Sequence, residues 1–327
     1  MMRKFREFFK LAFALAIIPM LILSSCKDET TTVSAYETLK TYMEENSLDL
    51  PDLLVDWVKP ADVLVDTTDY SIPSYYVIDI REAADFGAGH IKDAVNSTLA
   101  DILTEAGNAA GKPILVVCYT GQTAAHAVMA LRLSGYSDAV VLKFGMCGWH
   151  DDFAGSWLSN SGHDNGNTAI GSANWNSETA PALGSFDAPE WTSSSTDGAE
   201  ILAERVATTI SGGFLGVASA DVLANPDNYQ IINYWAEADY LTFGHFNGAF
   251  QLSPINFTNV DAFDFNSTSL VYCYTGQTSS MATFWLNTLG YNVKSIKFGA
   301  NSLVYDLLSA AGKPNYHGTL GYAYVTD

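Results

Sequence analysis

Short apolar runs alternate with longer mixed stretches along most of the chain. Residues 76–80 and 114–117 are rich in aliphatic and β-branched side chains, a composition typical of strands buried on both faces. A helix is predicted over residues 122–133, with apolar side chains along its length and an end near Gly135. The next strand is predicted at residues 139–142. This order of elements predicts a parallel sheet.

The same order of elements returns in the second half of the chain. Strands are predicted at residues 229–232, 270–272 and 293–296, and a helix is predicted at residues 277–289. We therefore expect an α/β protein with two domains of one fold, each a parallel sheet flanked by helices on both faces. The length of 327 residues also suggests about two domains.

An internal repeat supports this division of the chain. Residues 116–123 read VVCYTGQT and residues 271–278 read VYCYTGQT, so six consecutive residues are identical from Cys118 and Cys273 onward. A chance match of six residues has a probability on the order of 10⁻⁷ per pair of positions. The flanks also match, as Asp85-Phe86 with Asp239-Tyr240, Gly89-His90 with Gly244-His245, and Gly135-Tyr136 with Gly290-Tyr291.

Each repeated cysteine is expected between the end of a buried strand and the start of a helix. The free N–H groups at a helix start point toward such a sulfur, and together with the helix dipole they favour an anion. We therefore expect the pKa of such a thiol to lie below its ordinary value of about 8.5, which would make it a nucleophile. Gly121 and Gly276 allow the loop backbone to curl around the sulfur.

These ordered motifs resemble the rhodanese family of sulfurtransferases. In that family a strand ending near Asp-x-Arg leads to an acidic-aromatic-x-x-Gly-His segment, and a later strand ends in a catalytic cysteine that opens a six-residue loop. Residues 79–81, 85–90 and 118–123 match this order, and the resemblance covers about residues 50–150 and 215–310. It implies a rhodanese-like fold in each domain.

The resemblance also implies roles for individual residues. Cys118 and Cys273 would be catalytic and would carry sulfane sulfur as a persulfide. Asp79 and Arg81 would support the first loop or bind an anionic donor. The active-site loops would be formed by Tyr119, Thr120, Gly121, Gln122 and Thr123 in the first copy, and by Tyr274, Thr275, Gly276, Gln277 and Thr278 in the second.

The second copy departs from the family pattern. Asn233 and Trp235 stand where the first copy has its Asp and Arg, so we expect Cys118 to carry more of the activity. Neither loop contains Arg or Lys. Family members that favour thiosulfate often carry a basic residue just after the cysteine, whereas Tyr119 and Tyr274 occupy that place here. The identity of the sulfur donor therefore stays open.

Other chemistries fit the sequence less well. Cell-cycle phosphatases with a rhodanese-like fold use a longer loop whose arginine grips phosphate, but Ala124 and Ser279 stand six residues after the cysteines. His90 and His245 have no second His or Cys at ligand spacing, so we predict no metal site and expect turn histidines bonded to the backbone. Cys147 is either a small buried residue or a thiol that resolves a persulfide.

The first 26 residues differ from the rest of the chain. Four basic residues precede an apolar stretch at residues 11–23, which Ser24, Ser25 and Cys26 follow. The stretch is short for a membrane span, so we expect a signal peptide at residues 1–25. Its ending resembles a bacterial lipobox, which implies lipid on Cys26. The mature protein is then expected in the cell envelope of a bacterium, anchored by lipid, with the outer membrane favoured.

The net charge argues against one class of partner, and the cysteine count argues against a disulfide framework. Removal of residues 1–25 leaves 12 Lys and Arg against 35 Asp and Glu, a net charge near −23. Nucleic acid would be repelled by such a surface, so no nucleic-acid partner is expected. Apart from Cys26 three cysteines remain, an odd number that rules out a complete internal disulfide framework.

The sequence thus predicts one domain at residues 26–155 and another at residues 199–327. A Ser/Gly/Asn-rich segment, residues 156–198, joins them, and its three tryptophans predict that it packs against the domains. The expected function is transfer of sulfane sulfur from thiosulfate, polysulfide or a small persulfide to a thiol or cyanide. A thiolate nucleophile needs no cofactor for this reaction. The alternative is a slow sulfur carrier or an envelope interaction module.

Overall fold

The apolar runs of the first half form the centre of a parallel sheet in the computed structural model, which describes residues 34–327. Strand β4 is buried at every residue, as its aliphatic composition predicts. The strand order is β1-β5-β4-β2-β3. The strands are β1 (Val58–Lys59), β2 (Tyr76–Asp79), β3 (Val95–Asn96), β4 (Ile114–Val117) and β5 (Val140–Leu142).

The second half forms another five-stranded parallel sheet. Its order is β7-β12-β11-β8-β10, which repeats the order of the first sheet strand for strand. The strands are β7 (Gly216–Val217), β8 (Gln230–Asn233), β10 (Phe250–Gln251), β11 (Ser269–Tyr272) and β12 (Val293–Ile296). The predicted α/β fold with two parallel sheets is confirmed.

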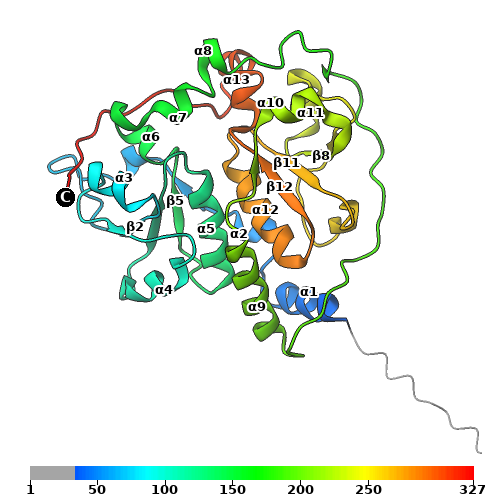
Figure 1. Ribbon diagram of the computed structural model, residues 1–327, viewed down its shortest axis with the longest axis horizontal. Helices are drawn as coiled ribbons and strands as arrows, with labels where there is room; N and C mark the ends of the chain where they lie inside the picture. Colours follow the sequence, from blue (N-terminus) through cyan, green and yellow to red (C-terminus); the bar gives the residue numbers. More distant parts are fainter. Residues whose placement is uncertain (1–33) are drawn as a thin grey trace, which may run out of the picture. The chain divides into compact units, whose positions relative to one another are not determined.

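Helices cover both faces of each sheet, and two of them form the contact between the halves (Figure 1). Helices α5 (Gln122–Leu133) and α12 (Gln277–Leu289) pack against each other, and nearly all of their side chains are buried. Both match the helices predicted from the sequence. The longer remaining helices are α1 (Ala35–Glu45), α3 (Ala83–Ala88), α4 (Ile102–Ala106), α9 (Gly198–Ser211), α10 (Ser219–Ala224), α11 (Glu237–Phe243) and α13 (Tyr305–Ala310). The four-residue helices are α2 (Leu50–Leu53), α6 (Met146–Trp149), α7 (Gly155–Leu158) and α8 (Gly162–Asn165).

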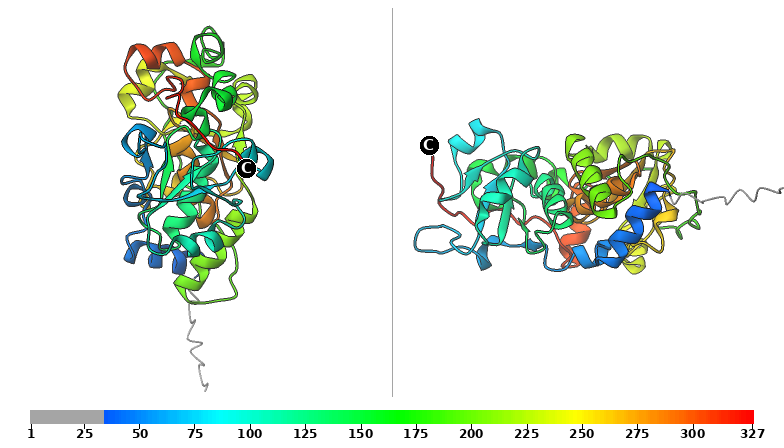
Figure 2. Two further views of the ribbon diagram at one scale, coloured as in Figure 1. Left: turned by 90° about the vertical axis from the view of Figure 1, so that its left-hand side faces the viewer. Right: turned by 90° about the horizontal axis from the view of Figure 1, so that it is seen from below.

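The segment that follows each sheet crosses to the other half. In the first of these straps, residues 166–178, strand β6 (Trp175–Asn176) pairs with strand β9 (His245–Phe246) of the second half. In the second strap, residues 314–327, Val325 forms an antiparallel bridge with His90 of the first half. Figure 2 shows this C-terminal strap, in red, running along the first half. Each half is therefore completed by chain from the other.

The three tryptophans of the segment between the sheets contact the domains, as predicted, whereas residues 181–188 of the same segment are exposed. Trp157 is fully buried. The indole N–H of Trp175 donates to the carbonyl of Phe243 at 3.1 Å, and that of Trp191 donates to the carbonyl of Leu289 at 3.1 Å. Cys26 and the predicted signal peptide lie outside the described residues. No helix within residues 34–327 has both the length and the apolar character that crossing a membrane requires.

Candidate active site

Cys118 lies directly after β4, at the point where the chain turns into α5. Its Sγ accepts hydrogen bonds from the backbone N–H of Gly121 at 3.1 Å and of Ala124 at 3.3 Å. Gly121 has a φ of +81°, a left-handed conformation that an L side chain rarely adopts. The strand, loop and helix start therefore cradle the sulfur as the sequence predicts.

Cys273 occupies the equivalent place between β11 and α12. Its Sγ accepts from the backbone N–H of Ser279 at 3.3 Å, and its thiol donates to the hydroxyl of the same residue at 3.6 Å. Gly276 repeats the left-handed turn with a φ of +77°. The two sites share their backbone design but differ in the side chain behind the sulfur.

Both cysteines are buried, Cys118 to 5% exposure and Cys273 to 3%. Burial raises the pKa of the Cys118 thiol, because an anion loses its hydration there. The loop N–H groups act in the opposite direction but do not outweigh this loss. The expectation of a lowered thiol pKa is therefore wrong for Cys118, since a motif alone does not show how much water the fold removes.

The loop tyrosines are each held by a carboxylate from the repeated acidic-aromatic motif. Burial and Asp85 together raise the pKa of Tyr119 to about 12. The hydroxyl of Tyr274 donates to Asp239, which also accepts from the Lys313 ammonium at 2.7 Å. The repeated acid therefore fixes the residue next to each cysteine.

Asp79 and Arg81 form a buried ion pair beside the first loop. The Arg81 Nη2 donates to Asp79 Oδ2 at 2.6 Å and to the Gly89 carbonyl at 2.7 Å. Its guanidinium lies between the rings of Tyr119 and Phe153, at 5.2 and 5.3 Å from their centroids. The Nε and Nη2 groups of Arg81 are thus engaged, whereas its Nη1 is buried without a hydrogen-bond partner beside the loop.

The second half keeps this layout with different chemistry. The Asn233 amide donates to the Tyr272 hydroxyl at 2.7 Å and accepts from the backbone N–H of Trp235 at 3.1 Å. The Trp235 ring stacks on Tyr274 with 5.1 Å between centroids, as Arg81 lies over its own loop tyrosine. A planar group therefore covers the loop tyrosine in both halves.

The two cysteine loops contact each other. The Gln277 amide donates to the Thr120 carbonyl at 3.1 Å, and the Gln122 side chain accepts from the backbone N–H of Phe298 at 2.8 Å. Thr275 is buried in the second loop. Thr123 and Thr278 are half-buried at the starts of α5 and α12. Thr120, Gln122 and Gln277 of the predicted loops thus lie at the boundary between the halves.

The histidines of both motifs are bonded to the backbone as expected, although His245 lies in strand β9 and not in a turn. His90 Nδ1 lies 2.9 Å from the Phe86 carbonyl, and the two rings stack. His245 Nε2 lies 2.8 Å from the Glu178 carbonyl of the first strap. Within residues 34–327, no cluster of three or more His, Cys, Asp or Glu side chains is arranged to hold a metal ion.

Cys147 lies fully buried beneath the first loop. Its backbone N–H donates to the Tyr119 carbonyl at 2.9 Å, and its thiol donates to the Phe153 carbonyl at 2.9 Å. Burial raises the pKa of the Cys147 thiol to about 11. These contacts are those of a small buried residue with a structural thiol, the first of the two roles that the sequence allows.

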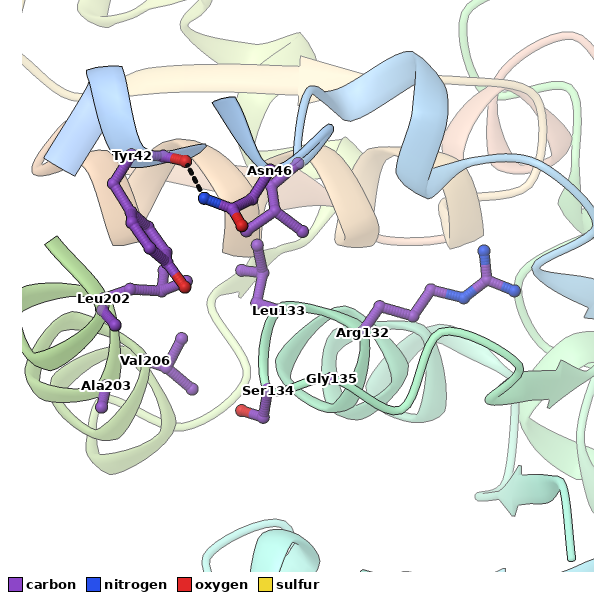
Figure 3. Close-up of a pocket in the computed structure, with 11 residues that line it drawn as sticks. Tyr42, Asn46, Arg132, Leu133, Ser134, Gly135, Leu202, Ala203 and Val206 are labelled. Atoms are coloured by element: carbon purple, nitrogen blue, oxygen red, sulfur yellow. Dashed lines mark hydrogen bonds between the residues drawn. The ribbon is translucent and has the colours of Figure 1, made fainter. Parts of the chain in front are cut away.

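A groove of about 480 Å³ lies at the opposite end of α5 from the cysteine loop. It is formed by α1, α5 and α9 (Figure 3), and Tyr42, Leu133 and Leu202 line it. Arg132 borders the groove but donates to the carbonyls of Leu53 and Val55. These bonds hold the guanidinium against the backbone, and the groove is separate from the sulfur site.

Sequence reasoning missed several residues of the site. In the sequence, Ser279 served only to exclude a phosphatase loop. Ser295 of β12, whose hydroxyl lies next to that of Ser279, belongs to no motif. The role of the repeated acids was also missed, although their repetition in both halves was the available signal. The contacts between the loops join residues about 150 positions apart, so no local sequence pattern predicts these contacts.

The fold and site define a class of α/β proteins with a cysteine cradled at the end of a central parallel strand. The sequence model of the rhodanese-like domain family matches residues 61–152. The chain is 33% identical over 79 residues to the thiosulfate sulfurtransferase GlpE of Shewanella oneidensis, covering 24% of this chain and 78% of that protein. It is 34% identical over 76 residues to GlpE of Pseudomonas savastanoi, covering 22% and 70%. The chain belongs to the rhodanese family of sulfurtransferases.

Among solved structures, the chain is similar to a thiosulfate sulfurtransferase from Pseudomonas aeruginosa. The similarity covers 82% of this chain and 47% of the other, at 15% identity and a TM-score of 0.29.

Proposed function

We propose that this protein transfers sulfane sulfur through persulfides on Cys118 and Cys273. The observation that carries the proposal is the repeated cradle, in which backbone N–H groups at a helix start donate to each cysteine sulfur. Such donors stabilise a charged sulfur, whether it belongs to a thiolate or to a persulfide. Membership of the rhodanese family supports the same chemistry.

The reaction has two steps, here written for thiosulfate. The cysteine thiolate attacks the outer sulfur of thiosulfate, the sulfur–sulfur bond breaks, and sulfite leaves with the electron pair. In the second step an acceptor thiolate or cyanide attacks the outer persulfide sulfur, and the cysteine thiolate is released. No electrons are gained or lost overall, so neither step requires a redox cofactor.

The charges around the loops favour donors with little negative charge. Neither loop carries a basic side chain, and the guanidinium of Arg81 is paired with Asp79. Lys313 is likewise paired with Asp239 beside the second loop. A dianion such as thiosulfate therefore finds little local compensation, whereas a small organic persulfide of lower charge needs less.

A turnover assay separates an enzyme from a slow carrier. Purified protein is mixed with thiosulfate, polysulfide or glutathione persulfide and with cyanide, and thiocyanate is measured over time. An enzyme gives many thiocyanate molecules per chain, and the Cys118→Ser/Cys273→Ser double variant gives none above background. A single stoichiometric burst would favour the carrier, and equal rates in the double variant would exclude both cysteines.

We also propose that the mature protein is held at a bacterial cell envelope by lipid on Cys26. The support is the order of residues before this cysteine, in which basic residues, an apolar stretch and Leu23-Ser24-Ser25 follow one another. Several acyl chains on one residue would suffice for stable attachment, since each buried CH₂ contributes about 0.8 kcal/mol.

A further inference from the structure

Two buried hydroxyl groups lie behind the sulfur of Cys273. The Ser279 hydroxyl is 3.6 Å from Cys273 Sγ, and it is 2.7 Å from the hydroxyl of Ser295 on β12. Both serines are fully buried. The Ser295 hydroxyl also lies 3.5 Å from the carbonyl of Gly276, in the turn of the loop. A continuous hydrogen-bonded chain therefore leads from the thiol to the loop backbone.

The first half has no such chain. Ala124 stands six residues after Cys118, where Ser279 stands after its own cysteine. Val141 pairs with Val116 on the neighbouring strand, as Ser295 pairs with Val271. The two hydroxyls are thus replaced by apolar side chains at matching positions in the first half. The Cys118 site can therefore serve as the reference for the Cys273 site within one molecule.

Hydroxyl groups can reverse their hydrogen bonds when the charge of a neighbour changes. With a neutral thiol, Cys273 donates to Ser279, which can donate to Ser295. With a charged sulfur, Ser295 can donate to Ser279, which then donates to the sulfur. The second site can therefore present an O–H donor that the first site lacks. A charge-assisted hydrogen bond of this kind changes an equilibrium by roughly ten- to a hundredfold.

We propose that Ser279 is a positioning residue that donates to the Cys273 sulfur in its charged forms, with Ser295 orienting the Ser279 hydroxyl. The inference rests on the proposed function, since it concerns the same sulfur. It assigns the second half a hydroxyl donor to the sulfur beside the backbone N–H of Ser279, although that half lacks the Asp-Arg pair.

Few other groups near Cys273 change charge. Among residues 34–327, the hydroxyls of Tyr234 and Tyr274 are the titratable groups whose pKa values are raised in part by Cys273. Burial raises the pKa of Tyr234 to about 12 and also raises the pKa of Tyr274. Asp239 is paired with Lys313 and with the Tyr274 hydroxyl. Between pH 5 and 9 these tyrosines therefore stay neutral and Asp239 stays ionised, so their charges do not change over the range of the test.

The test is the pH profile of alkylation by iodoacetamide, followed for each cysteine peptide by mass spectrometry in the full chain. Ser279→Ala should slow alkylation of Cys273 about tenfold at neutral pH and move its profile to higher pH. Cys118 in the same molecules should keep its profile, which serves as the control for folding. Ser295→Ala should shift the Cys273 profile in the same direction by a smaller amount.

Unchanged Cys273 profiles in both serine variants would overturn the inference. If Ser279→Ala fails to fold, the alkylation profile of Cys118 also changes. In that case the Cys273 profile of Ser295→Ala tests the inference. The reciprocal Ala124→Ser/Val141→Ser variant should speed alkylation of Cys118, and no gain there would also count against the hydroxyl pair. Alkylation needs no sulfur donor. A shifted profile without sulfur loading would therefore contradict the proposed function alone, and normal loading without a shift would contradict only this inference.

Discussion

At the scale of single residues, burial changes the pKa that a sequence motif predicts for a side chain. The loop around Cys118 has the donors that the sequence predicts, yet removal of water raises the pKa of its thiol. The sequence ranks Cys118 first because only the first half has Asp79 and Arg81, and the structure places this ion pair beside the first loop. The ranking stays a prediction, and both cysteines keep their cradles.

Replacement of the loop tyrosine should improve the use of thiosulfate. Tyr119→Arg places a cation beside Cys118, in a loop that otherwise carries none. A charge-assisted hydrogen bond to the donor is worth roughly 1.5–3 kcal/mol, so the Michaelis constant for thiosulfate should fall about ten- to a hundredfold. Tyr119→Phe, which adds no charge, is the control. Steady-state kinetics check this, and tight saturation of the wild type would count against it.

His126 should make the fold sensitive to acid. Its side chain is fully buried on α5 against Phe284, and desolvation lowers its pKa to about 4. Between pH 6.5 and 4 the unfolded chain binds a proton that the folded chain does not, so stability falls as pH falls. The difference amounts to about 3 kcal/mol.

The matched variant is His126→Met, since Met281 occupies the equivalent position on α12. Its free energy of unfolding should fall less than that of the wild type between pH 6.5 and 4. Urea titrations at several pH values measure this difference. Parallel pH dependence in the two proteins would show that His126 takes up its proton without cost.

At the scale of elements, the sequence predicts the sheets and the two central helices well. Their side chains carry a strong local pattern, and residues 122–133 and 277–289 are helical as expected. The straps could not be predicted in this way. They bond largely through backbone groups to parts of the chain far away in sequence, as Val325 does to His90, and such contacts leave no periodic pattern.

The second strap contains a glycine in the left-handed region of backbone conformation. Gly321 has a φ of +68°, and Gly171 has a similar angle of +79° in the first strap. Gly321→Ala meets no neighbouring atom, so its cost is conformational and should be about 1 kcal/mol. Gly87→Ala, within α3 and also in open space, should be neutral or stabilising. Urea unfolding compares the two, and an equal effect would argue against a strained turn.

At the scale of the whole molecule, the repeat and the family resemblance already indicate sulfur transfer from the sequence alone. They do not show that the cysteine loops touch or that each half is completed by the other's strap. These features follow from packing between the halves, which the Gln277 bond to Thr120 illustrates. The sequence therefore predicts the elements and motifs that depend on neighbouring residues. It does not predict the contacts between segments that lie far apart in the chain.

Attachment to the envelope is the prediction for the intact molecule in the cell. Cys26→Ala should move the protein from the membrane fraction to the soluble fraction, because the acylated side chain is lost. Ser25→Ala should leave the distribution unchanged, since a small residue is kept before the cysteine. Immunoblots of separated fractions measure this. Continued membrane retention of Cys26→Ala would contradict the lipid anchor.

The most direct test of the central claim is intact-mass analysis of the chain after exposure to a sulfane donor. We expect one added sulfur atom for Cys118 and one for Cys273, both removed by cyanide. Cys118→Ser and Cys273→Ser should each lose one addition, whereas Cys147→Ser should keep both. An unmodified wild type, or sulfur that persists in the Cys118→Ser/Cys273→Ser variant, would contradict the account.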